Sequence, residues 1–183
     1  MVDTGKLESL CRELLLAIGE NPERPGLQDT PRRWAAWWRE FIDHEAGNTF
    51  TIFPSANVDQ MVVLTGIRVW SLCEHHLLPF WCDVAIGYIA DGNIIGISKL
   101  VRIAKKHARR LQVQEHLVAN IADEVARTSG SEDVAVTARG EHLCMQMRGV
   151  ESEALMISHA MRGDFRVHAE VRAEFLRMIS GER

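Results

Sequence analysis

Two short segments that lie far apart in the chain carry residues able to bind one metal ion, and this constrains the fold. The first is Cys73-Glu74-His75-His76, and the second is His142-Leu143-Cys144. Two thiolates and one imidazole form a three-ligand set typical of catalytic zinc, in which the fourth tetrahedral position is left for water or substrate. A fold that places both segments around one ion predicts an enzyme.

The first segment leaves the choice of ligand open. Cys73 and His76, separated by two residues, can chelate one ion through a tight turn, and Leu77-Leu78-Pro79 favours a turn there. His75 would then lie beside the metal, where it can move protons. The opposite choice, with His75 as the ligand, is geometrically possible. A structural site with four protein ligands, in which His142 is the fourth, is a further alternative.

The second segment falls in residues 133–150, for which the sequence predicts a strand. Side chains alternate between the two faces of a strand, so His142, Cys144, Gln146 and Arg148 would share one face and the intervening apolar residues the other. A half-buried strand whose polar face meets water is the alternative interpretation of this segment taken alone.

Composition is consistent with one compact globular domain. The chain has 183 residues, of which 46% are hydrophobic and 25% are charged. It has no basic segment followed by an apolar run at its start and no run long enough to span a bilayer, so we expect a cytoplasmic protein without a membrane partner. The net charge of -4 argues against broad binding to nucleic acid.

The four cysteines are expected to be reduced thiols or metal ligands, because no export signal accompanies them. Cys11 lies on the apolar face of a predicted helix and is assigned to the core, and Cys82 is assigned mostly to packing.

The order of predicted elements indicates an α+β fold with an antiparallel sheet and long helices. Helical patterns come in blocks rather than alternating singly with strands. Residues 1–60 are predicted to form an N-terminal helical region, and 61–183 a catalytic domain. The expected strands are 61–70, 83–90, 93–98 and 133–150, with a hairpin turn at Asp91-Gly92, and the expected helices are 7–15, 30–42, 100–126 with a break near 110–112, and 171–179.

Two further groups of polar residues could bind an anion and a base. Ser98 and Lys99 lie at a predicted helix start, with Arg102 one turn along, where free N–H groups favour an anion. In the cluster that ends with Gln114 and Glu115, a carboxylate could accept hydrogen bonds from an amidine-like edge such as that of guanine.

Five segments in order resemble the GTP cyclohydrolase I family. They are Cys-Glu-His-His-Leu-Leu-Pro-Phe at 73–80, Ile-Gly-Tyr-Ile at 86–89, Gly-Ile-Ser-Lys-Leu at 96–100, Arg-Arg-Leu-Gln-Val-Gln-Glu at 109–115 and Cys-Met-Gln-Met-Arg-Gly-Val at 144–150. The resemblance runs from about Thr30 to the C-terminal helix.

The resemblance implies a T-fold (tunnelling fold) assembled into a toroidal homodecamer with active sites at subunit interfaces. It implies hydrolytic opening of the imidazole ring of GTP, release of formate and formation of 7,8-dihydroneopterin triphosphate. The residue roles that it implies are zinc binding by Cys73, His76 and Cys144, proton handling by His75 and His142, guanine recognition by Gln114 and Glu115, and triphosphate binding by Ser98, Lys99, Arg102, Arg148 and Arg33.

The chain departs from the family pattern at the phosphate end and in one strand. Ala36 stands where a lysine usually lies one turn after the residue matched to Arg33, and His116 replaces an arginine. Residues 151–159 replace a Ser/Thr-rich strand. Three alternatives therefore remain: action on another purine nucleotide, a reaction that stops at a formamidopyrimidine intermediate, or a non-catalytic pterin- or purine-binding regulator.

Overall fold

The computed structural model describes residues 1–56 and 59–181, and the chain divides into two compact units, Met1–Glu45 and Ala46–Arg183. The first unit is a pair of helices, α1 (Thr4–Ala17) and α2 (Thr30–Ile42). Cys11 of α1 is buried, which confirms its assignment to a core. In α2 the ring of Trp37 stacks on that of Phe41, with the ring centroids 5.8 Å apart.

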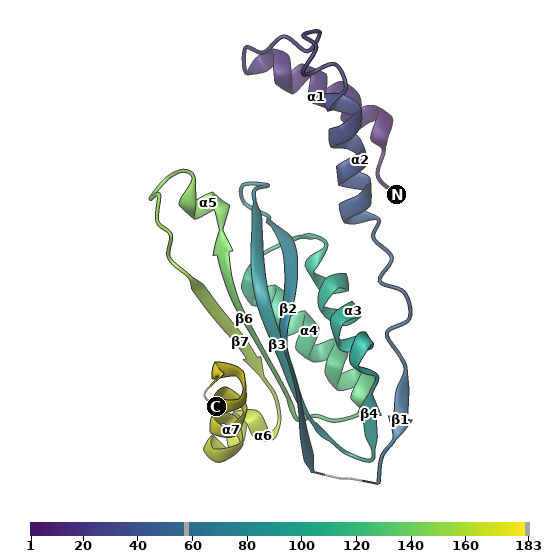
Figure 1. Ribbon diagram of the computed structural model, residues 1–183, viewed down its shortest axis with the longest axis vertical. Coiled ribbons are helices and arrows are strands. Elements are labelled where there is room, and N and C mark those ends of the chain that lie inside the picture. The colour runs from purple at the N-terminus through teal and green to yellow at the C-terminus, as the bar shows by residue number, and fades with distance from the viewer. Residues whose placement is uncertain (57–58, 182–183) are drawn as a thin grey trace. The chain divides into compact units, whose positions relative to one another are not determined.

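The second unit contains the sheet and the remaining helices (Figure 1). In chain order its elements are β1 (Ile52–Pro54), β2 (Gln60–Cys73), β3 (Pro79–Ala90), β4 (Asn93–Ile95), α3 (Ile97–Ala108), β5 (Leu111–Gln112), α4 (Gln114–Ser129), β6 (Val134–His142), α5 (Leu143–Gln146), β7 (Met156–Met161), α6 (Asp164–Val167) and α7 (Ala169–Ser180).

Five strands form one sheet in the order β5-β2-β3-β6-β7. The pairs β2–β3, β3–β6 and β6–β7 are antiparallel, whereas β5 runs parallel to the end of β2. The predicted break in the long helical stretch is confirmed, because the chain leaves α3, adds β5 beside Leu72 and Cys73, and then begins α4. The start of α4 is thereby held close to the end of β2.

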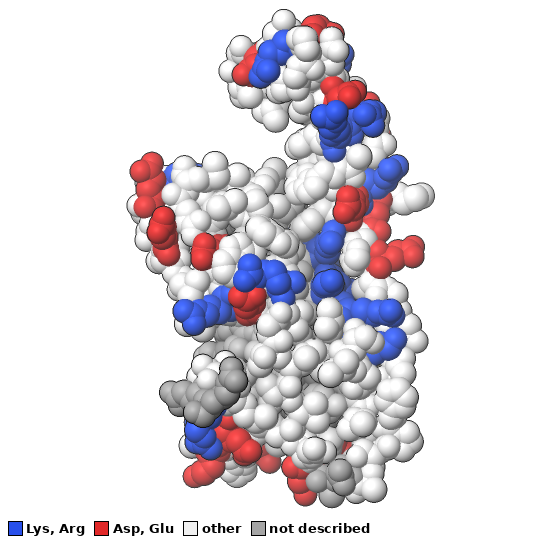
Figure 2. Space-filling view, viewed as in Figure 1, with Lys and Arg blue, Asp and Glu red and all other residues white. Residues whose placement is uncertain are grey.

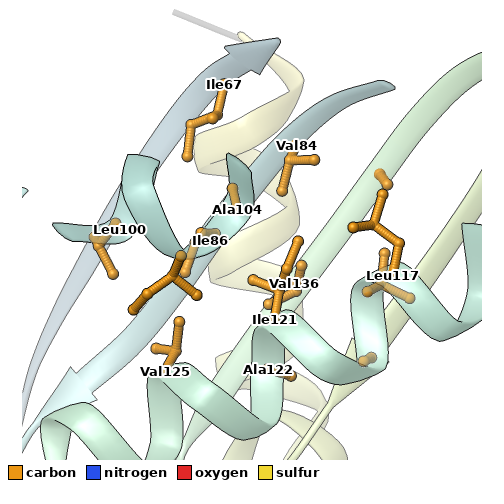
Figure 3. Packing of buried hydrophobic residues seen from close by; sticks show 14 of the residues in the cluster. Ile67, Val84, Ile86, Leu100, Ala104, Leu117, Ile121, Ala122, Val125 and Val136 are labelled. Carbon is orange, nitrogen blue, oxygen red and sulfur yellow. The ribbon is translucent and has the colours of Figure 1, made fainter. Parts of the chain in front are cut away.

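The main core lies between one face of this sheet and the helices α3 and α4 (Figure 3). Alternate residues of β3 point into it, as the two-residue period of a strand requires, and Val84 and Ile86 are fully buried. They meet Leu100 and Ala104 of α3 and the apolar side of α4. The α4 side chains labelled in the figure are Leu117, Ile121, Ala122 and Val125.

The C-terminal helix α7 covers part of the opposite face of the sheet. Phe175 of α7 is fully buried and packs with Phe165 at a centroid distance of 5.5 Å. A Cβ atom at Gly87 of β3 would lie 2.7 Å from the Phe175 ring, so glycine is needed for this close approach. The predicted C-terminal helix is confirmed.

Three predicted features are wrong. The strand predicted for residues 93–98 ends at Ile95, and α3 begins at Ile97. The turn at Asp91-Gly92 does not join a hairpin, because β4 pairs with β1 in a separate two-stranded sheet. The strand predicted for residues 133–150 ends at His142, and Leu143–Gln146 forms one helical turn. Phe80, next to the first residue of β3, is the partner of His142, so the strand has no neighbour on β3 beyond that residue.

The predicted α+β class is confirmed, and the long strands β2 and β3, the helices α3 and α4, and the strands β6 and β7 form the T-fold, with the short elements β4, β5 and α5 between them. Among residues 1–56 and 59–181, no helix combines the length and apolar character needed to span a membrane. Basic and acidic side chains are interspersed on the face shown in Figure 2.

Candidate active site

The turn between β2 and β3 folds His76 back onto Cys73. The Cys73 N–H donates to the Leu78 carbonyl at 2.9 Å, and the Leu77 N–H donates to the Cys73 carbonyl at the same distance. Leu77 has a left-handed backbone, with φ of 57°. As a result, Nδ1 of His76 lies 3.7 Å from Sγ of Cys73. The predicted turn is confirmed.

Cys144 of α5 completes a group of three potential ligands. The ligand atoms of Cys73, His76 and Cys144 all lie within 4.8 Å of one another. In a tetrahedral zinc site with bond lengths of about 2.0 to 2.3 Å, neighbouring ligand atoms are roughly 3.5 to 3.8 Å apart. The spacing and the soft sulfur donors therefore fit a metal such as zinc.

The Cys144 thiol of this group is harder to ionise than a free cysteine thiol. Burial raises the pKa of the Cys144 thiol, and the adjacent Cys73 raises it further through a hydrogen bond and its charge. Because thiolate is the form that binds metal, binding must release protons.

His75 lies beside this group and is more open to solvent. Its Nδ1 is 3.9 Å from Sγ of Cys73, and its side chain is 65% exposed. The rings of His75 and His76 meet edge to face, with centroids 6.2 Å apart. An imidazole in this position can exchange protons with water while remaining next to the metal ligands.

His142 is the last residue of β6 and is held more firmly. Its ring stacks on that of Phe80, with centroids 4.5 Å apart and planes 10° apart. Burial lowers the pKa of His142, and the negative charge of Glu115 acts in the opposite direction. With Cys144, Met145 and Met156, His142 lines a cavity of about 380 Å³.

Gln114 and Glu115 begin α4, but they face different surroundings. Gln114 is completely buried, and its Oε1 lies 2.9 Å from Nε2 of His142. Glu115 is exposed and lines a second cavity of about 460 Å³ with His159 of β7 and three arginines. These arginines are Arg162, Arg166 and Arg172.

The candidate phosphate-binding residues come from three different parts of the chain. Arg148 donates from Nη1 to Nε2 of His76 at 2.8 Å, so it adjoins the potential metal ligands. Ser98 and Lys99 lie in the first turn of α3, and Arg102, in the second turn, donates to the backbone carbonyl of Asn48 at 3.2 Å. Arg33 lies in the first unit and pairs with Asp29 at 3.1 Å.

The structure thus brings together most of the candidates for metal binding, proton transfer and guanine recognition, which we call the base end of the site. It does not bring them together with Ser98 and Lys99, which we call the phosphate end. Ser98 and Lys99 lie at the first end of α3. The other end, at Ala108, is the one that leads into β5, which pairs with the end of β2. A helix of this length spans roughly 16 to 18 Å, and Figure 1 shows its start near β4, away from α5.

Sequence reasoning missed three residues that support His142. Phe80 supplies the stacked ring, Cys82 donates from Sγ to Oε1 of Gln114 at 3.3 Å, and Gly140 leaves room for both neighbours. The two-residue spacing of Phe80 and Cys82 places them on one face of β3, which was the available signal.

Comparison with known proteins assigns the family. The sequence profile of GTP cyclohydrolase I matches residues 7–180. The chain is 44% identical to GTP cyclohydrolase 1 of Hyperthermus butylicus over 183 residues, covering 100% of this chain and 94% of the relative. It is 41% identical to GTP cyclohydrolase 1 of Aquifex aeolicus, covering 98% of both chains.

Among solved structures, the apo form of the archaeosine synthase QueF-Like matches with a TM-score of 0.45 and 18% identity, covering 55% of this chain and 92% of that one. The profile match and the full-length relatives, together with the converging Cys and His residues, show that the chain belongs to the GTP cyclohydrolase I family and is an enzyme of that type.

Proposed function

We propose that this enzyme opens the imidazole ring of the guanine of GTP with water in a zinc-dependent reaction, releases formate and forms 7,8-dihydroneopterin triphosphate. The observation that carries the proposal is the convergence of Cys73, His76 and Cys144, with His75 and His142 on the segments that supply these ligands. The names of the full-length relatives support GTP as the substrate.

Zinc held by Cys73, His76 and Cys144 would supply Lewis-acid activation of water. In this proposal His75 and His142 carry protons to and from the purine as one water adds at C8 and the C8–N9 bond breaks, and as a second water then hydrolyses the resulting N7 formamide to formate and a free amine. Imidazoles suit this role, since their ordinary pKa lies near neutral pH. The Glu115 carboxylate holds the purine by accepting hydrogen bonds from its N1–H and amino group.

Cationic groups would hold the triphosphate. The first turn of α3 offers N–H groups and the positive end of the helix dipole together with Ser98 and Lys99. Arg102, Arg148 and Arg33 add guanidinium groups, which can donate two parallel hydrogen bonds to phosphate. Ala36 supplies no charge, so this end of the site has one cation fewer than the family pattern.

A homo-oligomer, which the family resemblance makes a toroidal decamer, would unite the two ends of the site. In the described part of the chain, the sheet ends at β7 on one side and, along most of its length, at β2 on the other. Unpaired edges of this kind can pair with another copy. Pairing of β7 with the next copy's β2 is a head-to-tail contact, which forms a ring when the rotation between copies closes.

The test is to incubate zinc-loaded protein with GTP, GDP, GMP and guanosine, and to measure formate release and the fluorescence of the oxidised pterin. Formate and pterin from GTP are expected. Formate without pterin would instead indicate a reaction that stops after ring opening and deformylation. Turnover of a nucleotide with fewer phosphates would indicate a different substrate, which the absence of a lysine at Ala36 would allow. Neither product from any substrate would remove the proposal and favour a non-catalytic regulator.

The proton-handling roles have a separate test. We expect His75→Ala and His142→Ala each to reduce turnover about 100-fold or more, the usual range for a general acid or base. Zinc content should remain unchanged, whereas Cys144→Ala should lose zinc. Full activity in either histidine variant would contradict these roles.

A further inference from the structure

The side chain of Gln114 is oriented by its own hydrogen bonds. Its Nε2 lies 3.0 Å from the carbonyl oxygen of Ala138, 3.2 Å from that of Met156 and 3.0 Å from Oγ of Ser158. Carbonyl oxygens only accept hydrogen bonds, so the amide NH2 must face them. The amide oxygen therefore points the other way.

That oxygen meets two groups that must both donate to it. Oε1 of Gln114 lies 2.9 Å from Nε2 of His142 and 3.3 Å from Sγ of Cys82. Because an amide oxygen cannot donate, Nε2 of His142 carries the hydrogen, and in the neutral ring the lone pair is on Nδ1. Burial raises the pKa of Cys82 to about 12, which keeps its thiol protonated and able to donate.

The surroundings allow little alternative arrangement. Gln114 is fully buried and Phe80 stacks on the His142 ring. At Gly140, a Cβ atom would lie 2.6 Å from Sγ of Cys82 and 3.0 Å from Oε1 of Gln114, so the chain has no side chain where the amide approaches β6.

We propose that Gln114 is a positioning residue that fixes His142 as the Nε2–H tautomer and leaves Nδ1 as the proton-accepting atom of the ring. The use of that atom in turnover rests on the function proposed above. Every polar atom of the Gln114 side chain has a partner within the chain, so its effect on the purine is exerted through His142, and Glu115 alone of this pair offers its side chain to the base.

The tautomer can be measured without turnover. Solid-state ¹⁵N NMR of zinc-loaded protein labelled at histidine, with His142 assigned from the loss of its signals in His142→Asn, should show a protonated Nε2 and an unprotonated Nδ1 at a pH where the ring is neutral. The opposite tautomer would overturn the proposal. This result is independent of whether GTP is the substrate, so it separates a failure here from a failure of the proposed function.

The kinetic test uses Gln114→Met, which keeps the length of the side chain but removes the acceptor. We expect kcat to fall about 10- to 100-fold, less than the roughly 100-fold or more expected for loss of the proton carrier itself, with KM for GTP and zinc content unchanged. A raised KM with unchanged kcat would show a direct purine contact and overturn the proposal.

A double-mutant comparison separates positioning from a direct contact. In the His142→Ala background, Gln114→Met should have little further effect, because the residue that it positions is gone. An undiminished effect there would contradict the proposal.

The matched control is Gln112→Met, the same replacement at another buried glutamine, whose Nε2 donates to Ser71 and to the His107 carbonyl. It should leave the His142 ¹⁵N signals unchanged, whereas Gln114→Met should show both tautomers. Equal changes in both variants would mean a general structural effect and would also overturn the proposal. If Gln114→Met does not fold, the His142 tautomer measured in the wild-type protein still tests the proposal.

Discussion

At the scale of single residues, Gly140 has the strictest steric requirement near the candidate site. A Cβ atom there would clash with the backbone oxygen of Trp81, which cannot move aside as a flexible side chain can. It would also press on Cys82 and Gln114. Glycine is therefore required by the close contact of β3, β6 and α4, not by an unusual backbone angle.

Gly140→Ala should destabilise the fold by about 1 to 3 kcal/mol, the usual cost of overpacking, and should disturb His142. The measurement is the urea midpoint of unfolding together with the His142 ¹⁵N signals. Gly5→Ala is the control, because Gly5 is exposed and the nearest atom to its added Cβ, Oδ1 of Asp3, is 3.7 Å away. An unchanged midpoint in Gly140→Ala would contradict the steric argument.

At this scale the sequence predicts the chemical role of a residue better than it predicts which other residues that residue contacts. Two thiols and the neighbouring histidines identify a metal-binding set from residue type alone, because few other roles need that combination. The contact between Gln114 and His142 spans 28 positions and depends on how α4 packs under β6. Local patterns do not contain that information, and the assignment of Gln114 to guanine rests on the family resemblance.

At the scale of elements, α3 and α4 are joined by a buried carboxylate. Glu124 of α4 is 1% exposed, and it accepts hydrogen bonds from Lys106 at 2.8 Å and His107 at 2.5 Å. Its removal would leave two donors of α3 without their partner. We expect Glu124→Gln to cost about 1 to 3 kcal/mol at pH 7, measured by urea unfolding, with the exposed Glu132→Gln as the control.

Protonation of the same cluster should make stability fall in acid. Burial lowers the pKa of His107 from its ordinary 6.5. Burial alone would raise the pKa of Glu124, but hydrogen bonds from Lys106 and His107 outweigh it and the pKa lies below 4.5. Both groups bind protons more tightly in the unfolded chain, so stability is lost as pH falls, below 6.5 for His107 and below 4.5 for Glu124.

The measurement for this prediction is the urea midpoint between about pH 7.5 and 5.5, a window in which ordinary histidines titrate. His107→Gln should show a flatter dependence than the wild type, and His116→Gln, at an exposed position, should not. An identical slope in His107→Gln and the wild type would rule out His107 as the source.

The ends of helices and strands are predictable where the local sequence pattern agrees with the availability of a neighbouring strand. The break between α3 and α4 was visible in the sequence, and the end of β6 was not. Polar and apolar residues continue to alternate past His142, which is the local signal of a strand, but β3 offers no partner beyond Phe80. Strand formation requires a neighbour, so the chain turns into α5 and brings Cys144 to the other ligands.

At the scale of the whole molecule, the wide separation of the two ends of the site predicts complementation between inactive variants. His75→Ala lacks a base-end group, and Lys99→Ala a phosphate-end group. If two copies build each site, unfolding and refolding an equal mixture should restore about a quarter of wild-type activity. Half of the base ends and half of the phosphate ends are intact, so about a quarter of the sites combine two intact ends. Formate release measures the recovery.

The control for complementation is a mixture of His75→Ala and Glu115→Ala, both expected at the base end of one copy. It should remain inactive. Recovery in this control, or none in the first mixture, would mean that one copy builds the whole site.

The ligand geometry also has a mechanical consequence. An ion bound by Cys73 and Cys144 would cross-link the β2–β3 turn to α5 and close a long loop that contains α3, α4 and β6. Residues 147–155, which follow α5, lie outside any helix or strand. Chelation should therefore speed trypsin cleavage after Arg148, as mass spectrometry of the fragments can show, whereas unchanged cleavage would exclude the cross-link. Metal supply would then set the lifetime of the polypeptide as well as its catalytic state.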